Sequence, residues 1–198
     1  MTVATKTNLR RSIGVGNQDV ITVAKNDSCA QREISVFSTE FGWFGLLGEG
    51  GQLVSTFVGH PTSKSVRAAA ARQGEISLER DWAPSIRQMF VDYTNGEIVD
   101  FASLSVCLPA VTGFRRQVLQ ATRRLRYGET VTYGELAERV GHPGAARAVG
   151  TVMSTNRFPI LIPCHRVLAA GGKLGGYTSP SGTDFKLRLL DLEARAAG

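Results

Sequence analysis

The chain has 198 residues, enough for one large domain or two small ones with an apolar core. The net charge of +6 is uneven: residues 112–198 carry 13 Lys and Arg against 6 Asp and Glu, whereas residues 1–111 carry 10 against 11. A nucleic-acid backbone suits such a basic half, although a solvated face without a ligand has the same composition. The cysteines, Cys29, Cys107 and Cys164, show no paired spacing, which argues against a disulfide framework or a zinc site.

The apolar pattern of the chain predicts how the protein relates to membranes. No apolar stretch is long enough to span a membrane, and residues 1–12 lack the apolar core of a signal peptide. We therefore expect a soluble protein in a reducing compartment, with no membrane partner. The expected location is the cytoplasm, or the nucleoid within it if the source is bacterial.

The first half of the chain predicts a small α/β domain. Residues 1–32 are polar and weakly periodic, which indicates a flexible extension. Strand patterns follow over residues 34–37, 42–47 and 53–58, with a glycine-rich turn at 48–51. Helices are predicted over 65–73 and 85–93. We expect an N-terminal domain over 33–106, a linker over 109–113 and a C-terminal domain over 107–198.

The second half predicts a mainly helical domain. One helix begins near Phe114, with arginines 115, 116, 123 and 124 on its outer side. Thr132 and Glu135 form a capping box that predicts the next helix. After a break at residues 141–144, a further helix should bury Ala148, Val149 and Val152 and expose Arg147, Gly150, Thr151 and Ser154. Two short helices across a glycine-containing turn predict a helix-turn-helix.

Residues 160–167 hold the strongest candidate for chemistry. Residues 160–162 are apolar and Pro163 favours an extended backbone before it, so Cys164 should follow a strand-like segment. His165 and Arg166 place ionisable and cationic groups beside the thiol, which predicts a lowered thiol pKa. The alternative is that Cys164 is a small core residue, because free cysteine is commonly buried.

A last helix is predicted over residues 184–194, and Glu193 falls on its apolar stripe with Phe185 and Leu189. A carboxylate there is costly unless it is paired. Two readings stay open: Glu193 lies in solvent at the helix end, or it orients His165.

Taken together, these residues resemble the methylated-DNA–protein-cysteine methyltransferases, also called O6-alkylguanine-DNA alkyltransferases. The resemblance is strong from Thr112 to Glu193 and weaker before it. It is carried by Ala145–Gly150, Asn156, Pro159–Val167, Gly176, Tyr177, Lys186, Leu189, Leu190 and Glu193. It implies an α+β fold whose C-terminal domain carries a winged-helix-like helix-turn-helix.

The resemblance implies direct reversal of DNA damage without a cofactor or metal. Cys164 would take the alkyl group of O6-alkylguanine, and of O4-alkylthymine, in double-stranded DNA, once per molecule. Adjacent side chains of an extended backbone point apart, so His165 would act through a bridging water. Glu193 would hold the imidazole. Asn156 would brace this network or, alternatively, cap a helix.

The resemblance also implies which residues bind DNA. We expect the protein to be a monomer. Arg147 would fill the space left by the flipped nucleotide, and Tyr133 would crowd the phosphate and protonate the leaving guanine. Small residues would suit the minor groove. The full DNA-contact set is Tyr133, Ala146, Arg147, Gly150, Thr151, Arg157 and Arg166, and the substrate pocket is Met153, Pro159, Val167, Tyr177 and Thr178.

Two departures from the family pattern stand out. Arg157 occupies a position where the family usually has proline, and it could gain a phosphate contact. The segment from Thr178 to Gly182 is about two residues longer than usual, and acts either as a mobile lid or as a surface bulge. Two other functions remain as alternatives: a lesion-binding protein without transfer activity, and a cysteine hydrolase, for which no oxyanion donors are evident.

Overall fold

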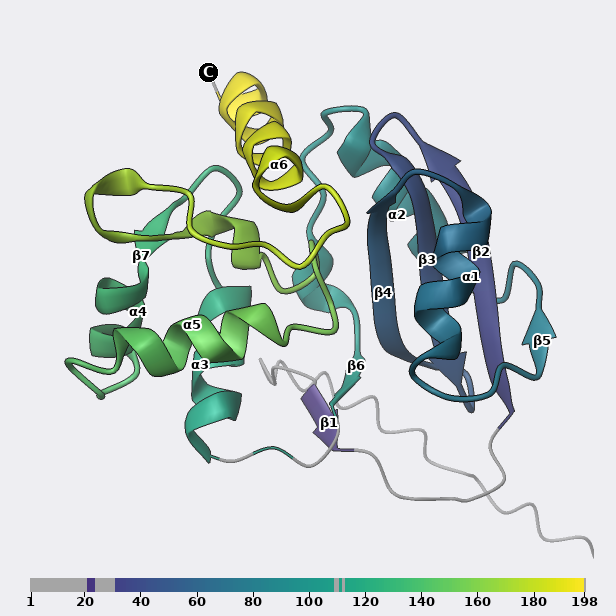
Figure 1. Ribbon diagram of the computed structural model, residues 1–198, viewed down its shortest axis with the longest axis horizontal. Helices are drawn as coiled ribbons and strands as arrows, with labels where there is room; N and C mark the ends of the chain where they lie inside the picture. Colours follow the sequence, from purple (N-terminus) through teal and green to yellow (C-terminus); the bar gives the residue numbers. More distant parts are fainter. Residues whose placement is uncertain (1–20, 24–30, 109–110, 112, 198) are drawn as a thin grey trace, which may run out of the picture.

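The computed structural model describes residues 21–23, 31–108, 111 and 113–197. Two lobes lie side by side, with β1 and β6 between them (Figure 1). We call residues 31–108, with β1, the N-terminal lobe and residues 113–197 the C-terminal lobe. The fold is α+β, as predicted. Within the described residues, no helix combines the length and apolar character needed to cross a bilayer.

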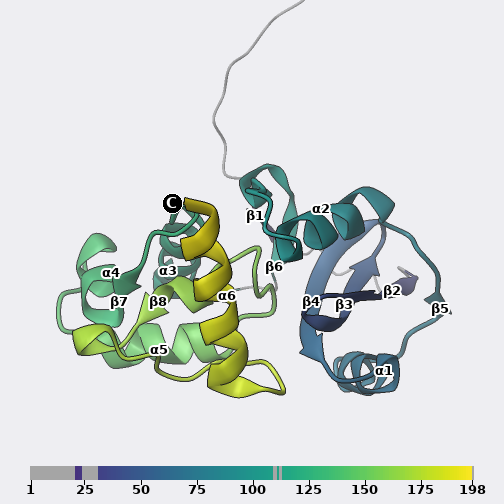
Figure 2. The same cartoon turned by 90° about the horizontal axis from the view of Figure 1, so that it is seen from above.

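A six-stranded sheet in the order β1-β6-β4-β3-β2-β5 forms the N-terminal lobe. Its elements are β1 (Ile21–Val23), β2 (Arg32–Thr39), β3 (Gly42–Glu49), β4 (Gln52–His60), α1 (Ser63–Ala71), β5 (Leu78–Glu79), α2 (Pro84–Thr94), η1 (Phe101–Ser103) and β6 (Val106–Leu108). Gly50 and Gly51 form the two-residue turn between β3 and β4, and both have positive φ, as a tight hairpin turn requires. Helices α1 and α2 lie against opposite faces of the sheet (Figure 2).

One expectation for this lobe is wrong in part. Ile21–Val23 form strand β1, parallel to β6, and β2 already begins at Arg32, so neither belongs to a flexible extension. Parallel pairing between segments so far apart in sequence leaves no local pattern, because the partner strand supplies the hydrogen bonds. Residues 1–20 and 24–30, the rest of that predicted extension, lie outside the described residues.

Helices dominate the C-terminal lobe. Its elements are α3 (Gly113–Arg123), β7 (Val131–Thr132), α4 (Tyr133–Arg139), α5 (Ala146–Ser154), η2 (Cys164–Arg166), β8 (Val167–Leu168), η3 (Ala170–Gly172) and α6 (Gly182–Ala197). The capping box of Thr132 and Glu135 opens α4, as predicted. Strand β7 pairs in parallel with β8, so Val131 and Val167 lie opposite each other. This pairing brings the start of α4 next to the cysteine segment.

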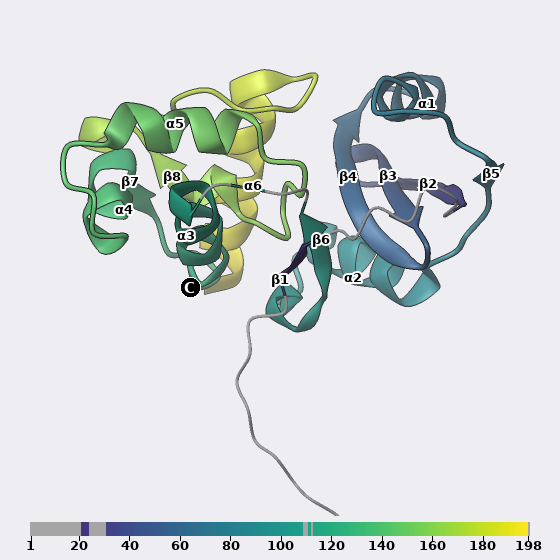
Figure 3. The same ribbon diagram turned by 90° about the horizontal axis from the view of Figure 1, so that it is seen from below.

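The two lobes share one apolar core. Phe185 of α6 packs edge-on against Phe41, with ring centroids 6.0 Å apart, and lies 6.3 Å from Phe44 of β3. The backbone amide of Thr56 in β4 donates to the carbonyl oxygen of Arg157 at 2.8 Å. Figure 3 shows β6 running between the two lobes. The cysteine segment is therefore held from both sides.

Arg123 and Ala148 differ from the helical pattern read in the sequence. Arg123 is buried, and its guanidinium donates to carbonyl oxygens of Phe101 and Ala102 in the other lobe. Ala148 is exposed, and Met153 takes its place on the buried face of α5. Both errors come from neighbouring elements, which decide which side of a helix is covered.

Candidate active site

Cys164 lies at the start of the 3-10 helix η2 and is 4% exposed. The segment before it is a turn rather than the predicted strand. Ile160 has φ +75°, the only positive value at a non-glycine among the described residues, and an isoleucine tolerates that geometry poorly. The amide of Ile162 closes the turn by donating to the carbonyl oxygen of Phe158 at 2.8 Å. A turn with a strained backbone at Ile160 therefore places Cys164 at the start of η2.

Asn156 contacts the thiol directly. Its Nδ2 lies 3.2 Å from Cys164 Sγ and donates to the carbonyl oxygen of Ile162 at 2.8 Å, while its Oδ1 accepts from the amide of Phe158. The helix C-cap is Thr155. Asn156 therefore connects the end of α5, the turn and the sulfur.

The thiol pKa runs against the prediction from sequence. Burial raises the pKa of Cys164, and the hydrogen bond from Asn156 and the charge of Lys186 oppose this only in part. His165 and Arg166 were expected to lower it, but their side chains bond to Glu193 instead. The resting cysteine is therefore the neutral thiol, and reaction requires a base.

His165 is fully buried and bonded to Glu193. Its Nε2 lies 2.8 Å from Glu193 Oε1, so the proton on Nε2 points to the carboxylate. Nδ1 is buried and has no hydrogen-bond partner in the described part of the chain. Burial lowers the pKa of His165 despite the nearby carboxylate, so the ring is neutral at pH 7 and Nδ1 can accept a proton.

Glu193 is 1% exposed, which overturns the reading that it lies in solvent. Arg166 donates to both of its oxygens, at 2.9 Å from Nε and 2.8 Å from Nη2, and the amide of Gly128 donates to Oε2 at 3.1 Å. Burial acts to raise the pKa of this carboxyl, but the bonds from His165 and Arg166 outweigh it and hold the pKa far below its ordinary value. The group stays ionised.

Lys186 lies near the cysteine and Tyr93 bonds to Glu193, and the sequence analysis gave neither a role in the site. Lys186 is buried and its Nζ donates to the carbonyl oxygen of Val167 at 2.6 Å. Burial lowers its pKa to about 8. Lys186 and Glu193 are seven residues apart, on the helix face that also carries Phe185 and Leu189. This spacing could have shown from the sequence that Lys186 is buried with Glu193.

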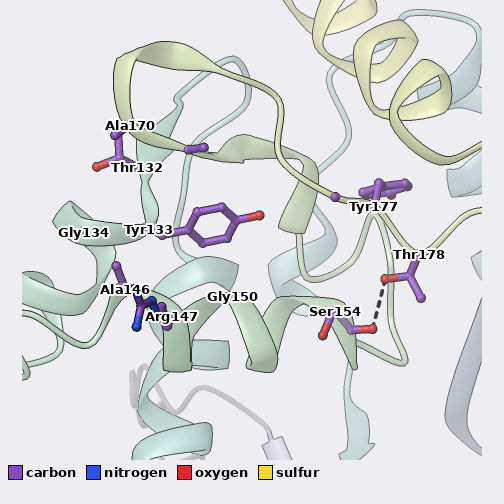
Figure 4. A pocket seen from close by; sticks show the side chains of 12 residues that line it. Thr132, Tyr133, Gly134, Ala146, Arg147, Gly150, Ser154, Ala170, Tyr177 and Thr178 are labelled. Atoms are coloured by element: carbon purple, nitrogen blue, oxygen red, sulfur yellow. Dashed lines mark hydrogen bonds between the residues drawn. The ribbon is translucent and has the colours of Figure 1, made fainter.

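A cavity of about 680 Å³ lies between α4, α5 and the segment before α6. It is lined by Thr132, Tyr133, Gly134, Ala146, Arg147, Gly150, Ser154, Ala169, Ala170, Gly176, Tyr177 and Thr178 (Figure 4). Its volume is typical of a small-molecule pocket. Burial, and then the nearby Cys164, raise the pKa of both Tyr133 and Tyr177, so the sulfur lies close to two lining phenols.

Chain geometry fixes the position of Tyr133 in this cavity. A Cβ placed on Gly175, which has φ +64°, would come within 3.0 Å of the Tyr133 hydroxyl. Glycine at 175 is therefore what lets the phenol approach the loop. Next to it, the Arg147 side chain is exposed and makes no hydrogen bond or ion pair with any described residue.

Several predicted contacts lie elsewhere. Met153 and Val167 are buried in the core, and Pro159 lines a different cavity, between the lobes. Arg166 is buried on Glu193, and Arg157 faces the N-terminal lobe, where it bonds to Gln73. Neither arginine is placed for a phosphate contact. Tyr133, Ala146, Arg147, Gly150, Tyr177 and Thr178 do meet at one cavity, and Thr151 is exposed on α5.

In the longer segment before α6, Ser179 is buried, whereas Thr178, Pro180 and Ser181 are exposed. The Thr178 hydroxyl donates to the carbonyl oxygen of Ser154 at 3.3 Å, which links the cavity rim to α5. The hydroxyl of the buried Ser179 lies close to Gly59 of the sheet.

Known proteins share the part of the chain that holds this site. Residues 113–195 match the family described as 6-O-methylguanine DNA methyltransferase, DNA binding domain. The methylated-DNA–protein-cysteine methyltransferase of Mycobacterium leprae is 50% identical over 124 residues, which are 62% of this chain and 72% of that protein. The chain belongs to this methyltransferase family.

Solved structures of the family extend the match to both lobes. The Mycobacterium tuberculosis O6-methylguanine methyltransferase aligns with a TM-score of 0.68 and 31% identity, over 86% of this chain and 96% of that one. M. tuberculosis OGT in complex with DNA aligns with a TM-score of 0.65 and 32% identity, over 83% and 94%. The methyltransferase match therefore includes the N-terminal lobe, where the sequence resemblance was weak.

Proposed function

We propose that this protein repairs alkylated DNA by transferring the alkyl group of O6-alkylguanine to Cys164. The observation that carries the proposal is a buried cysteine beside a neutral histidine base, next to a cavity lined by Tyr133, Arg147 and Tyr177. Residues 107–198 form the DNA-binding and acceptor domain, and residues 33–106 support it. O4-alkylthymine presents the same kind of alkyl–oxygen bond and is a second substrate.

The step balances without a cofactor. His165 Nδ1 takes the thiol proton through a bridging water, and the thiolate attacks the alkyl carbon. A sulfur–carbon bond forms, the carbon–O6 bond breaks, and its electron pair passes to the guanine ring. The Tyr133 hydroxyl gives that ring a proton, and its raised pKa means that it holds the proton until then. The thioether is stable, so each molecule reacts once.

Arg147 acts on the DNA rather than on the thiol. Its exposed side chain at the cavity rim can enter the duplex and occupy the place of the extruded nucleotide. Ala146, Gly150 and Thr151 present little bulk on the same helix, which suits the narrow minor groove. We infer that the protein acts as a monomer in the cytoplasm, on duplex DNA. Light scattering of the complex and fractionation of cells would test these two points.

Mass spectrometry tests the proposal. The wild-type protein incubated with duplex DNA containing O6-methylguanine should gain the mass of one methylene group, located on Cys164. The Cys164→Ser variant should gain nothing and still bind DNA, because phosphate contacts dominate affinity. No gain in the wild type would favour a lesion-binding protein, and release of methanol over many cycles would favour a hydrolase.

A further inference from the structure

Tyr93 of α2 connects the N-terminal lobe to the histidine and carboxylate behind the cysteine. Its hydroxyl donates to Glu193 Oε1 at 2.6 Å and lies 3.3 Å from His165 Nε2. The two bonded residues are 100 positions apart in the chain. Tyr93 is fully buried, with its ring 5.7 Å from Phe101 and 5.9 Å from Tyr127. The bond is shielded from water.

A hydroxyl at this position is chemically meaningful. Phenylalanine would fill the same apolar space, and burying a hydroxyl is unfavourable unless it is bonded. Tyr93 donates its hydrogen bond to Glu193 Oε1, the same oxygen that accepts from His165 Nε2. Of the donors to Glu193 in the described chain, Tyr93 alone comes from the N-terminal lobe.

We infer that Tyr93 is a positioning residue for the acceptor site: its hydroxyl fixes Glu193 Oε1, so that His165 keeps its proton on Nε2 and presents Nδ1 as the base for Cys164. The inference rests on the proposed function and extends it to the N-terminal lobe. This lobe then sets the reactivity of the cysteine, in addition to supporting the fold.

The consequence for pH dependence follows from charge. Each hydrogen bond to Glu193 draws negative charge away from His165, so loss of the Tyr93 bond makes the carboxylate attract a second ring proton more strongly. The pKa of His165 then rises and the neutral base becomes scarcer at a given pH. The other groups facing this pair, Arg166, Lys186, Tyr127, Tyr177 and Cys164, are unchanged by a substitution at 93.

The experiment compares Tyr93→Phe with Tyr127→Phe in the full chain. Both substitutions remove a phenolic hydroxyl from neighbouring rings, but the Tyr127 hydroxyl is buried and has no hydrogen-bond partner among the residues that the structure describes. The rate of benzyl transfer from free O6-benzylguanine to Cys164 is measured by mass spectrometry from pH 5 to 9. The substrate is the free nucleobase O6-benzylguanine, so that DNA binding does not contribute to the measured rate. Thermal unfolding confirms that each variant is folded at the assay temperature.

Tyr93→Phe should react about tenfold more slowly at neutral pH, with the acid limb of its rate profile moved to higher pH, and Tyr127→Phe should match the wild type. Equal rates and profiles for Tyr93→Phe and wild type would overturn the inference, and so would a uniform loss without a shift. A wild type that never reacts would overturn the proposed function instead.

A second measurement needs no variant. Ring ¹⁵N shifts of His165 in the wild type should show a neutral ring protonated on Nε2 at pH 7. An Nδ1-protonated ring would contradict the inference even if Tyr93→Phe does not fold.

Discussion

The two sides of Cys164 are built in opposite ways. Behind the sulfur, His165, Arg166 and Glu193 are buried and bonded to one another. In front of it, the face of α5 carries an exposed Arg147 among small residues that can admit a ligand closely. The comparison teaches that the basic charge of this half is not one surface. Arg123, Arg157 and Arg166 bond to other parts of the protein, whereas Arg147 is exposed at the cavity.

The buried side should respond most strongly to substitution. Glu193→Gln removes the partner of Arg166 and His165, and we expect alkyl transfer to fall about 10- to 100-fold on both free O6-benzylguanine and duplex DNA. The free energy of unfolding should drop by about 3 kcal/mol, because a buried arginine loses its counter-charge. Glu138→Gln, on the exposed side of α4, is the matched control.

Acid provides a further check of the same variant. Glu193 has a folded pKa below its unfolded value, so its stabilisation is present above about pH 4.5 and is lost as the pH falls. The stability gap between wild type and Glu193→Gln should therefore narrow below that pH. A constant gap down to pH 3 would mean that the ion pair is not what stabilises the fold.

A substitution on the exposed side should affect the reaction on duplex DNA without affecting the chemical step. Arg147→Ala should slow repair of O6-methylguanine in duplex DNA by about tenfold, since extrusion of a base costs a few kcal/mol, and leave the reaction with free O6-benzylguanine unchanged. Single-turnover rates on the two substrates measure this, with Arg195→Ala at the far end of α6 as the control. Equal losses on both substrates would mean that Arg147 acts on the chemical step, as His165 and Glu193 do, instead of on extrusion of the base.

Lys186 tests how the buried side holds a cation. Its pKa of about 8 lies below the unfolded value of 10.5, so between those values the unfolded chain binds more protons. Stability from this group therefore rises with pH across that window and is flat below it. The free energy of unfolding of the wild type, relative to Lys186→Met, should increase from pH 8 to pH 10 in urea titrations. No change would mean that the ammonium remains charged throughout.

Arg157 should show the smallest effect. Arg157→Ala loses the contact with Gln73 and should reduce the free energy of unfolding by about 1 kcal/mol. The salt dependence of DNA binding should stay as in the wild type, whereas Arg147→Ala should lower its slope by about one. A lower salt-dependence slope for Arg157→Ala would mean that Arg157 contacts a DNA phosphate after all.

Local chemistry carried much of the prediction. The capping box of Thr132 and Glu135, the glycines of the β3–β4 turn and the apolar period of α6 each act within a few residues, so they can be read from the chain. The motif around Cys164 identified the family for the same reason. Sequence alone thus determined the fold class and the family, whereas Cys164 as the alkyl acceptor and α5 as the helix that faces DNA stay predictions.

Tertiary structure decided everything that depends on partners far along the chain. Tyr93 meets Glu193 only because the fold brings the C-terminal end of α2 to that side chain of α6, and β1 becomes a strand only beside β6. Arginines that look alike in the sequence differ because burial and a distant carboxylate or carbonyl, not residue type, determine which guanidinium is bonded inside the protein. The thiol pKa follows the same rule, since desolvation by the assembled core outweighs its neighbours in sequence.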